Sequence, residues 1–155
     1  MQLFLIRHAI AEDGADDFSR PLSARGTRRF TRVVKGLQAA GVRFDLLLHS
    51  PKVRAVQTAE LAAGLVDGQT QLTPWLAEAP GPRLLAQLHG ARVAVVGHQP
   101  WLGELVSWLV LNDPSRGAAF VFKKGAVALL EGEPAPGRMQ LAGLWGPALL
   151  RRRRP

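Results

Sequence analysis

The protein has 155 residues, a formal net charge of +8 and no cysteine. This length suits one domain with a proper core, and the absence of cysteine excludes a disulfide framework, a thiolate metal site and a cysteine nucleophile. No segment approaches the roughly 18 consecutive apolar residues of a membrane-spanning helix, and no basic segment precedes the first apolar run, as one would in a signal peptide. We therefore expect a cytoplasmic protein with no membrane partner and one domain over residues 1–150.

The last residues, 151–155, form a basic tail in which Arg151 to Arg154 carry four of the positive charges. A basic terminus can contact nucleic acid, acidic lipid or an acidic partner, but such termini are more often simply solvated. We do not expect nucleic-acid binding. The moderately basic body suits an anionic substrate.

The chain opens on an apolar run, Met1–Ile6, that stops at Arg7 and His8. The run predicts a strand buried on both faces of a sheet. A buried cation is costly unless it is paired, and ligands of open α/β sheets bind beyond the carboxyl ends of the strands. Two interpretations follow from this stretch: a strand-end site that presents a cation and an imidazole, or an exposed arginine beside a capping histidine.

Apolar periodicity, helix caps and breakers predict the other elements. Helices are predicted over residues 23–40, 51–64, 83–88 and 100–111. Strands are predicted over residues 44–48, 71–76, 93–97, 120–122, 126–130 and 139–144. Ser23 and Ser50 are the expected N-caps of the first two helices, and Pro51 is expected at the first helical position. Strands that alternate with helices predict an α/β fold with a mostly parallel sheet between helices.

Three of the predicted strands end in chemically reactive turns. The first ends at Arg7-His8, the second at Ser50 with Arg54 one turn into the next helix, and the third at His98. If these strands are parallel neighbours, their ends converge and gather two arginines, two histidines and two helix N-termini. Guanidinium groups and helix N-termini both bind anions, so the sequence predicts a cationic pocket for a phosphoryl group.

An imidazole with its ordinary pKa of about 6.5 has a free ring nitrogen at neutral pH. We expect the two arginines to keep His8 neutral and to stabilise charge on the phosphoryl oxygens. His8 is then a candidate nucleophile that forms a covalent phosphohistidine, with His98 across the site as a donor to the oxygens.

Three motifs resemble those of the histidine phosphatase superfamily: Leu5–Ala9, Ser50–Ala59 and Val96–Pro100. The short chain and the segment Arg20–Gly26 resemble the SixA-type phosphohistidine phosphatase branch. The resemblance implies a three-layer α/β/α, phosphoglycerate-mutase-like fold and a metal-independent hydrolase without a cofactor. It also implies that His8 is the phosphorylated nucleophile, and that Arg7, Arg54 and His98 form the phosphate pocket.

The sequence departs from the family pattern in two respects. Ala9 replaces the usual glycine after the nucleophile, which is tolerable at negative φ. The glutamate that donates a proton in the phosphoglycerate-mutase branch has no convincing match, although Glu78 lies in about the right region and Asp17 and Glu12 are loop alternatives. A phosphorylated imidazole leaves as a weaker base than an alkoxide and needs less help from a proton donor. The lack of a clear general acid therefore favours a phosphohistidine substrate over a phosphate ester.

Other residues have more than one interpretation. Arg20 either contacts the phosphoprotein substrate or pairs with Asp16 or Asp17, and the pairing is favoured. Trp101 either lines the pocket rim or is buried, and burial is favoured. The histidines lack the spacing of metal ligands, so no metal is expected.

The expected function is hydrolysis of phosphohistidine on a partner protein, such as a phosphotransfer domain. The alternatives are a phosphatase for small phosphate esters, which needs Glu78 or a loop acid, and a non-catalytic anion- or nucleic-acid-binding module.

Overall fold

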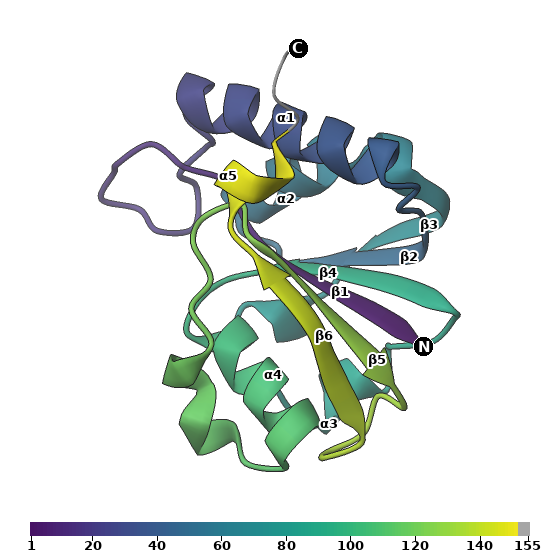
Figure 1. The fold of residues 1–155 in the computed structure, drawn as a ribbon. Coiled ribbons are helices and arrows are strands. Elements are labelled where there is room, and N and C mark those ends of the chain that lie inside the picture. The colour runs from purple at the N-terminus through teal and green to yellow at the C-terminus, as the bar shows by residue number, and fades with distance from the viewer. Residues whose placement is uncertain (152–155) are drawn as a thin grey trace.

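The computed structural model describes residues 1–151, and a six-stranded sheet forms its centre (Figure 1). The strands are β1 (Gln2–Arg7), β2 (Phe44–His49), β3 (Val66–Leu72), β4 (Arg92–Gly97), β5 (Val127–Gly132) and β6 (Met139–Trp145). They lie in the order β3-β2-β4-β1-β5-β6. All neighbouring pairs from β3 to β1 are parallel, whereas β5 is antiparallel to both β1 and β6. The predicted, mostly parallel sheet is confirmed.

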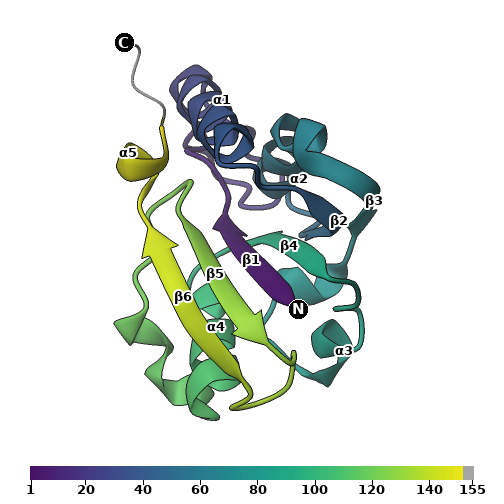
Figure 2. The same cartoon turned by 45° about the vertical axis from the view of Figure 1, so that its right-hand side comes forward.

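Helices cover both faces of this sheet. They are α1 (Ala24–Ala39), α2 (Val53–Leu61), α3 (Pro82–Leu85), α4 (Trp101–Leu111) and α5 (Pro147–Leu150), and short 3-10 turns span Ala63–Leu65, Pro74–Leu76 and Pro114–Ala119. The helices α1, α2 and α5 lie on one side of the sheet, and α3 and α4 lie on the other (Figures 1 and 2). This arrangement confirms the predicted three-layer α/β/α architecture.

The central strand β1 is buried on both faces, as its uninterrupted apolar sequence predicts. Leu3 and Leu5 belong to the core on the α4 side, whereas Phe4 and Ile6 belong to the core on the α1 side. Side chains alternate between the faces of a strand, so one run of apolar residues supports both cores.

The strands β1, β4 and β2 end at the same level of the sheet. Arg7 pairs with Gly97 across β1 and β4, and His49 pairs with Val96 across β2 and β4. The backbone N–H of His8 donates to the carbonyl of Gly97 at 3.1 Å, and that of Ser50 donates to the carbonyl of Val96 at 3.1 Å. The three turns predicted to carry the chemistry are therefore brought together at one edge.

The start of α1 packs against the segment that follows β1. Ser23 is its N-cap, as predicted, and the Ser23 hydroxyl accepts from the N–H of Gly26 at 2.9 Å. A Cβ atom on Gly26 would lie 2.0 Å from the carbonyl oxygen of Ile10, so only glycine fits. This close contact holds the chain two residues after His8.

The prediction that Ser50 caps α2 and that Pro51 opens it is wrong. The N-cap is Lys52, without a side-chain hydrogen bond, and the helix begins at Val53. The Ser50 hydroxyl is within 2.7 Å of His98 Nε2, and the carbonyl of Phe18 accepts from the N–H of Val53 instead. A distant loop thus performs the capping that the sequence assigns to Ser50.

Two predicted strands also need correction. Residues 120–122 form no strand, because side chains bind their carbonyls: Gln99 donates to Phe120 and Arg7 donates to Phe122. The strand predicted over 71–76 is β3, which ends at Leu72 and is followed by a 3-10 turn at Pro74. Because β3 is a polar, largely exposed edge strand, it lacks the apolar pattern that marks a buried one.

Within residues 1–151, no helix is long and apolar enough to cross a membrane. The cytoplasmic location and the extent of the domain over residues 1–150 stay predictions. Most of the basic tail, residues 152–155, lies outside the described residues.

Candidate active site

His8 follows β1 directly and is buried, with 5% of its surface exposed. Its Nδ1 lies 2.7 Å from the carbonyl oxygen of Ala9. Because a carbonyl oxygen only accepts, Nδ1 carries the hydrogen and the lone pair of the neutral ring lies on Nε2. Arg54 Nε donates to this Nε2 at 3.3 Å. The backbone thus fixes the tautomer and leaves the lone pair of Nε2 beside Arg54.

The pKa of His8 is lowered to about 4, chiefly by burial and also by the charges of Arg54, Arg7 and Lys124, against the opposing effect of the Ala9 hydrogen bond. A cation beside an imidazole disfavours the imidazolium. At neutral pH the ring is therefore uncharged.

We expect the His8 ring to titrate with a pKa of about 4. The ring stays neutral as the pH falls from 7 and gains a proton only near pH 4. A ¹H–¹⁵N NMR titration of the histidine ring signals measures this. A midpoint for His8 near the ordinary value of about 6.5 would contradict the burial and charge effects described above.

Arg54 lies in the first turn of α2 and is 4% exposed. Thr58, one turn further along, connects this helix to the end of β1. Its hydroxyl donates to the carbonyl of Arg54 at 2.7 Å and accepts from the N–H of Ala9 at 3.0 Å. The Thr58 hydroxyl therefore bridges the backbone of Arg54 and the backbone of Ala9, and this bridge fixes the position of α2 relative to His8.

His98 follows β4, is 3% exposed, and its ring centroid lies 5.1 Å from that of His8. Its Nε2 shares a hydrogen bond of 2.7 Å with the hydroxyl of Ser50. Its Nδ1 is buried and has no hydrogen-bond partner within residues 1–151. The pKa of His98 is lowered to about 3, chiefly by burial and also by the neighbouring His8, Arg54 and Lys52. A buried nitrogen without a partner is available to a ligand atom.

Arg7 is half-buried at the end of β1, and its Nη1 donates to the carbonyl of Phe122 at 2.6 Å. Its Nε is buried and has no partner within residues 1–151. Burial and the nearby Arg54 lower the pKa of Arg7, although an arginine stays charged at any ordinary pH. The structure thus gathers all four predicted residues, Arg7, His8, Arg54 and His98, at one strand edge.

The loop after β1 brings an acidic residue into this cationic cluster. Asp17 pairs with Arg20 at 3.0 Å, with Lys52 at 2.6 Å and with Arg54 at 3.1 Å. Its backbone carbonyl also accepts from Arg54 Nη1. The hydrogen bonds from Lys52 and Arg20 hold the pKa of Asp17 far below its usual range.

These contacts bear on two of the sequence alternatives. Asp17 is ionised at neutral pH and has no proton to donate, so it does not fit the role of general acid. Arg20 pairs with Asp17, the structural role favoured from the sequence, and its Nη1 also reaches the carbonyl of Glu12 at 3.4 Å.

The other candidate acids lie at the margin of the site. Glu78 is exposed and borders a small hollow that His98 and Trp101 also line. Glu12 is exposed on the loop after β1. Glu78 thus shares a hollow with His98.

Sequence reasoning missed two contributors. Ser50 binds His98 rather than capping a helix. Lys52 lies over the ring of Trp101, 5.5 Å from its centroid, and its position in the turn after β2 was the available signal.

Trp101, the first residue of α4, was expected to be buried. It is only partly buried, and its ring lies edge-on to that of His98 at 6.3 Å.

No group of three or more His, Asp or Glu residues suited to a metal ion occurs in the part of the chain that the structure describes. Metal independence stays a prediction.

The fold and site together define an α/β protein with a cluster of arginines and histidines at the carboxyl edge of parallel strands, an arrangement that suits an oxyanion. Residues 3–84 match the family model of the histidine phosphatase superfamily (branch 1). An uncharacterized protein of Picosynechococcus sp. (strain PCC 7002) is 39% identical over 118 residues, which are 67% of this chain and 70% of that protein. The chain belongs to the histidine phosphatase superfamily.

Solved structures narrow this assignment. The protein histidine phosphatase SixA, solved with tungstate, superposes with a TM-score of 0.80 and 26% identity over 97% of this chain and 99% of that one. The alpha-ribazole phosphatase from Shigella flexneri has a TM-score of 0.77 at 22% identity, over 93% and 96% of the two chains, and so shares the fold. The protein is a SixA-type phosphatase, and its fold also occurs in a phosphatase named for a small molecule.

Proposed function

We propose that this phosphatase hydrolyses phosphohistidine on a protein, through a phosphohistidine intermediate formed on His8. The observation that carries the proposal is the state of His8. Its Nδ1–H is bonded to the carbonyl of Ala9, its ring is neutral, and Nε2 faces the guanidinium of Arg54. A positioned neutral imidazole beside a phosphate-binding cation is suited to attack phosphorus.

In the first step, His8 Nε2 attacks phosphorus and forms a new N–P bond. The P–N bond to the substrate imidazole breaks, its electron pair moves to that nitrogen, and solvent supplies the proton. In the second step, water attacks the phosphoryl group on His8. The P–N bond to His8 breaks, the electron pair returns to Nε2, and inorganic phosphate leaves.

The surrounding residues stabilise the phosphoryl oxygens during both steps. Arg54 Nε donates to His8 Nε2 in the free protein and can turn to an oxygen once that nitrogen is bonded to phosphorus. Arg7 Nε and His98 Nδ1, the buried nitrogens without a partner described above, are available to the same group. Fixed donors of this kind stabilise a transition state because they need no reorganisation.

Phosphohistidine is favoured over an alcohol ester by the acids around the site. The carboxylate that pairs with Arg54, Asp17, is held ionised by its three cations. An alkoxide leaving group needs a proton from a general acid, whereas an imidazole leaves more easily. We infer that the substrate is a protein, such as a phosphotransfer domain, that presents its phosphohistidine to this edge.

A phosphatase for small phosphate esters is the second candidate. It is favoured by the hollow that joins Glu78 to His98, since Glu78 would be its proton donor. A non-catalytic binding module accounts less well for the fixed tautomer of His8.

The decisive measurement compares two substrates in EDTA: a histidine-phosphorylated protein and an alkyl phosphate. We expect kcat/KM for the phosphohistidine protein to be at least about 10²-fold higher, because only the alcohol requires an acid. A Glu78→Gln variant is the matched control and is expected to leave the phosphohistidine rate nearly unchanged. A preference for the alkyl phosphate that Glu78→Gln removes would establish the small-ester function instead.

A further inference from the structure

A groove with a basic rim lies beside the candidate active site. It runs between the segment that follows the 3-10 turn Pro114–Ala119 and helix α5, and an apolar floor is formed by Val121, Leu144 and Leu149. Val121 is 67% exposed and Leu149 is 79% exposed. Exposed apolar side chains that share one hollow are typical of a protein-binding surface.

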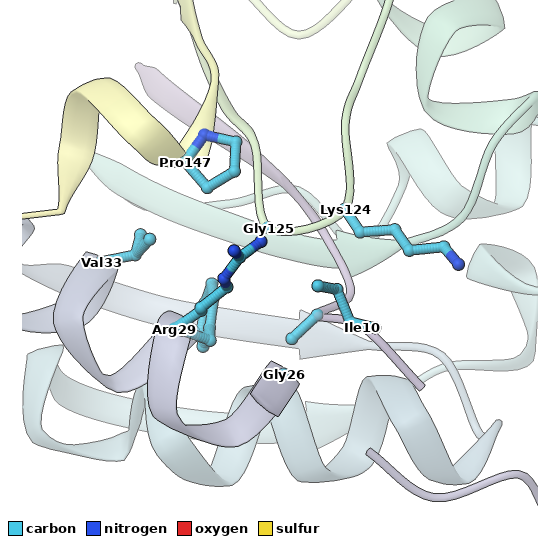
Figure 3. A pocket seen from close by; sticks show the side chains of 9 residues that line it. Ile10, Gly26, Arg29, Val33, Lys124, Gly125 and Pro147 are labelled. Carbon is cyan, nitrogen blue, oxygen red and sulfur yellow. The ribbon is translucent and has the colours of Figure 1, made fainter. Parts of the chain in front are cut away.

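Cations line the edge of this groove and continue toward His8. Arg29, Lys123 and Arg151 line the groove itself. A smaller hollow, which shares Arg29 and Pro147 with the groove, is lined by Ala9 and Lys124 (Figure 3). In Figure 3, Arg29 rises from α1 toward Gly125, and Lys124 extends away from it. We call these four cations, Arg29, Lys123, Lys124 and Arg151, the basic rim.

The segment with Lys123 and Lys124 is hydrogen-bonded to the end of β1, where His8 lies. The N–H of Gly125 lies 3.1 Å from the carbonyls of both Arg7 and His8, and Phe122 accepts from the Arg7 side chain. The charge of Lys124 acts on the His8 ring. A partner that lies in the groove therefore has its adjoining residues next to His8.

Within the part of the chain that the structure describes, the basic rim has no acidic partner of its own. No ion pair joins its members to a carboxylate within residues 1–151, and neither hollow has an Asp or Glu in its lining. By contrast, the cations Arg20, Lys52 and Arg54 share Asp17. The pKa of Arg29 is lowered by partial burial and by the charges of Arg25 and Arg151, as expected for crowded cations. The rim is complementary to an acidic surface.

We propose that this groove docks the substrate protein through an acidic segment with apolar side chains next to its phosphohistidine. The proposal rests on the proposed function and names the partner of that site. The carboxylates of the partner would lie along the basic rim, and its apolar side chains would cover Val121 and Leu149. Its phosphohistidine would then reach His8.

The test uses two phosphohistidine peptides that differ only beside the histidine: one has glutamate and leucine there, and the other has glutamine and leucine. We expect kcat/KM at low salt to be about tenfold higher for the acidic peptide, because charge complementarity raises the association rate. The preference should shrink as salt screens the charges over a Debye length of about 10 Å at 0.1 M. Equal rates for the two peptides would overturn the proposal.

The variant Lys123→Glu is expected to reduce the preference for the acidic peptide to less than about twofold. The matched control is Arg138→Glu, which makes the same change in net charge at the other end of β6, outside the groove lining, and should keep the preference. Leu149→Ser should lower kcat/KM for both peptides relative to phosphohistidine as the free amino acid. Equal preferences in Lys123→Glu and Arg138→Glu would exclude the groove.

Binding of the unphosphorylated peptides, measured by fluorescence anisotropy, separates docking from catalysis. Selective binding of the acidic peptide without any phosphohistidine hydrolysis would refute the proposed function and leave the docking surface standing. Hydrolysis of phosphohistidine without selective binding of the acidic peptide would support the proposed function and refute the docking surface. Binding of duplex DNA that is stronger than that of the acidic peptide and is lost in Lys123→Glu would assign the groove to nucleic acid and overturn the proposal.

Discussion

Replacing His8 with alanine is expected to lower phosphatase activity by at least about 10³-fold, because the nitrogen that attacks phosphorus is lost. The other pocket residues, Arg7, Arg54 and His98, remain and still bind phosphate. The loss should therefore fall on kcat rather than on binding. Steady-state hydrolysis of a phosphohistidine protein measures the loss, and tungstate or phosphate inhibition measures the binding that remains.

A covalent intermediate adds a second readout for this variant. Substrate labelled with ³²P should transfer label to the wild-type protein, and base-stable, acid-labile label should be absent from His8→Ala. The matched control is His89→Ala, which removes an exposed histidine and should react and label like wild type. Label that persists in His8→Ala would place the nucleophile elsewhere.

Replacing Arg54 with alanine is expected to lower kcat/KM by about 10³-fold, comparable with the loss of an arginine that stabilises a phosphoryl transition state. Arg54 is the side chain that donates to His8 Nε2, and its buried position allows no substitute from solvent. Arg54→Lys keeps the charge but not the planar fork, so we expect a loss of about 10²-fold. Parallel measurements of kcat and KM on one phosphohistidine substrate test both values.

The same substitution should change the titration of His8. The Arg54 charge lowers the pKa of His8, so Arg54→Ala should raise that pKa from about 4 toward its ordinary value, by less than the whole difference because burial is the larger cause. Asp17→Asn is the control: it removes a carboxylate partner of Arg54 but keeps the guanidinium and its contact with the Asp17 carbonyl. Activity in Arg54→Ala that is as high as in Asp17→Asn would refute a direct role.

Local patterns in the sequence determined much of the protein. The apolar run of β1 predicted a buried central strand because every side chain in it packs into one of two cores. Arg7 and His8 could be identified because charged groups directly after such a strand have no role in a core. His98 directly follows β4 and Arg54 lies in the first turn of the helix after β2, and the parallel register of β2, β4 and β1 then brings the three strand ends together.

Only the tertiary structure decided which groups surround these residues. Asp17 appears in the sequence as a loop acid, and its ion pair with Arg54 exists because the loop folds back across 37 positions of the chain. Ser50 was expected to cap a helix, but Phe18 satisfies the N–H of Val53 and leaves the hydroxyl to His98. The basic groove likewise joins α1, α5 and the loop before β5. Strand and helix signals act over a few residues, whereas these contacts join segments far apart in the sequence and form only when the sheet and its two helical layers have assembled.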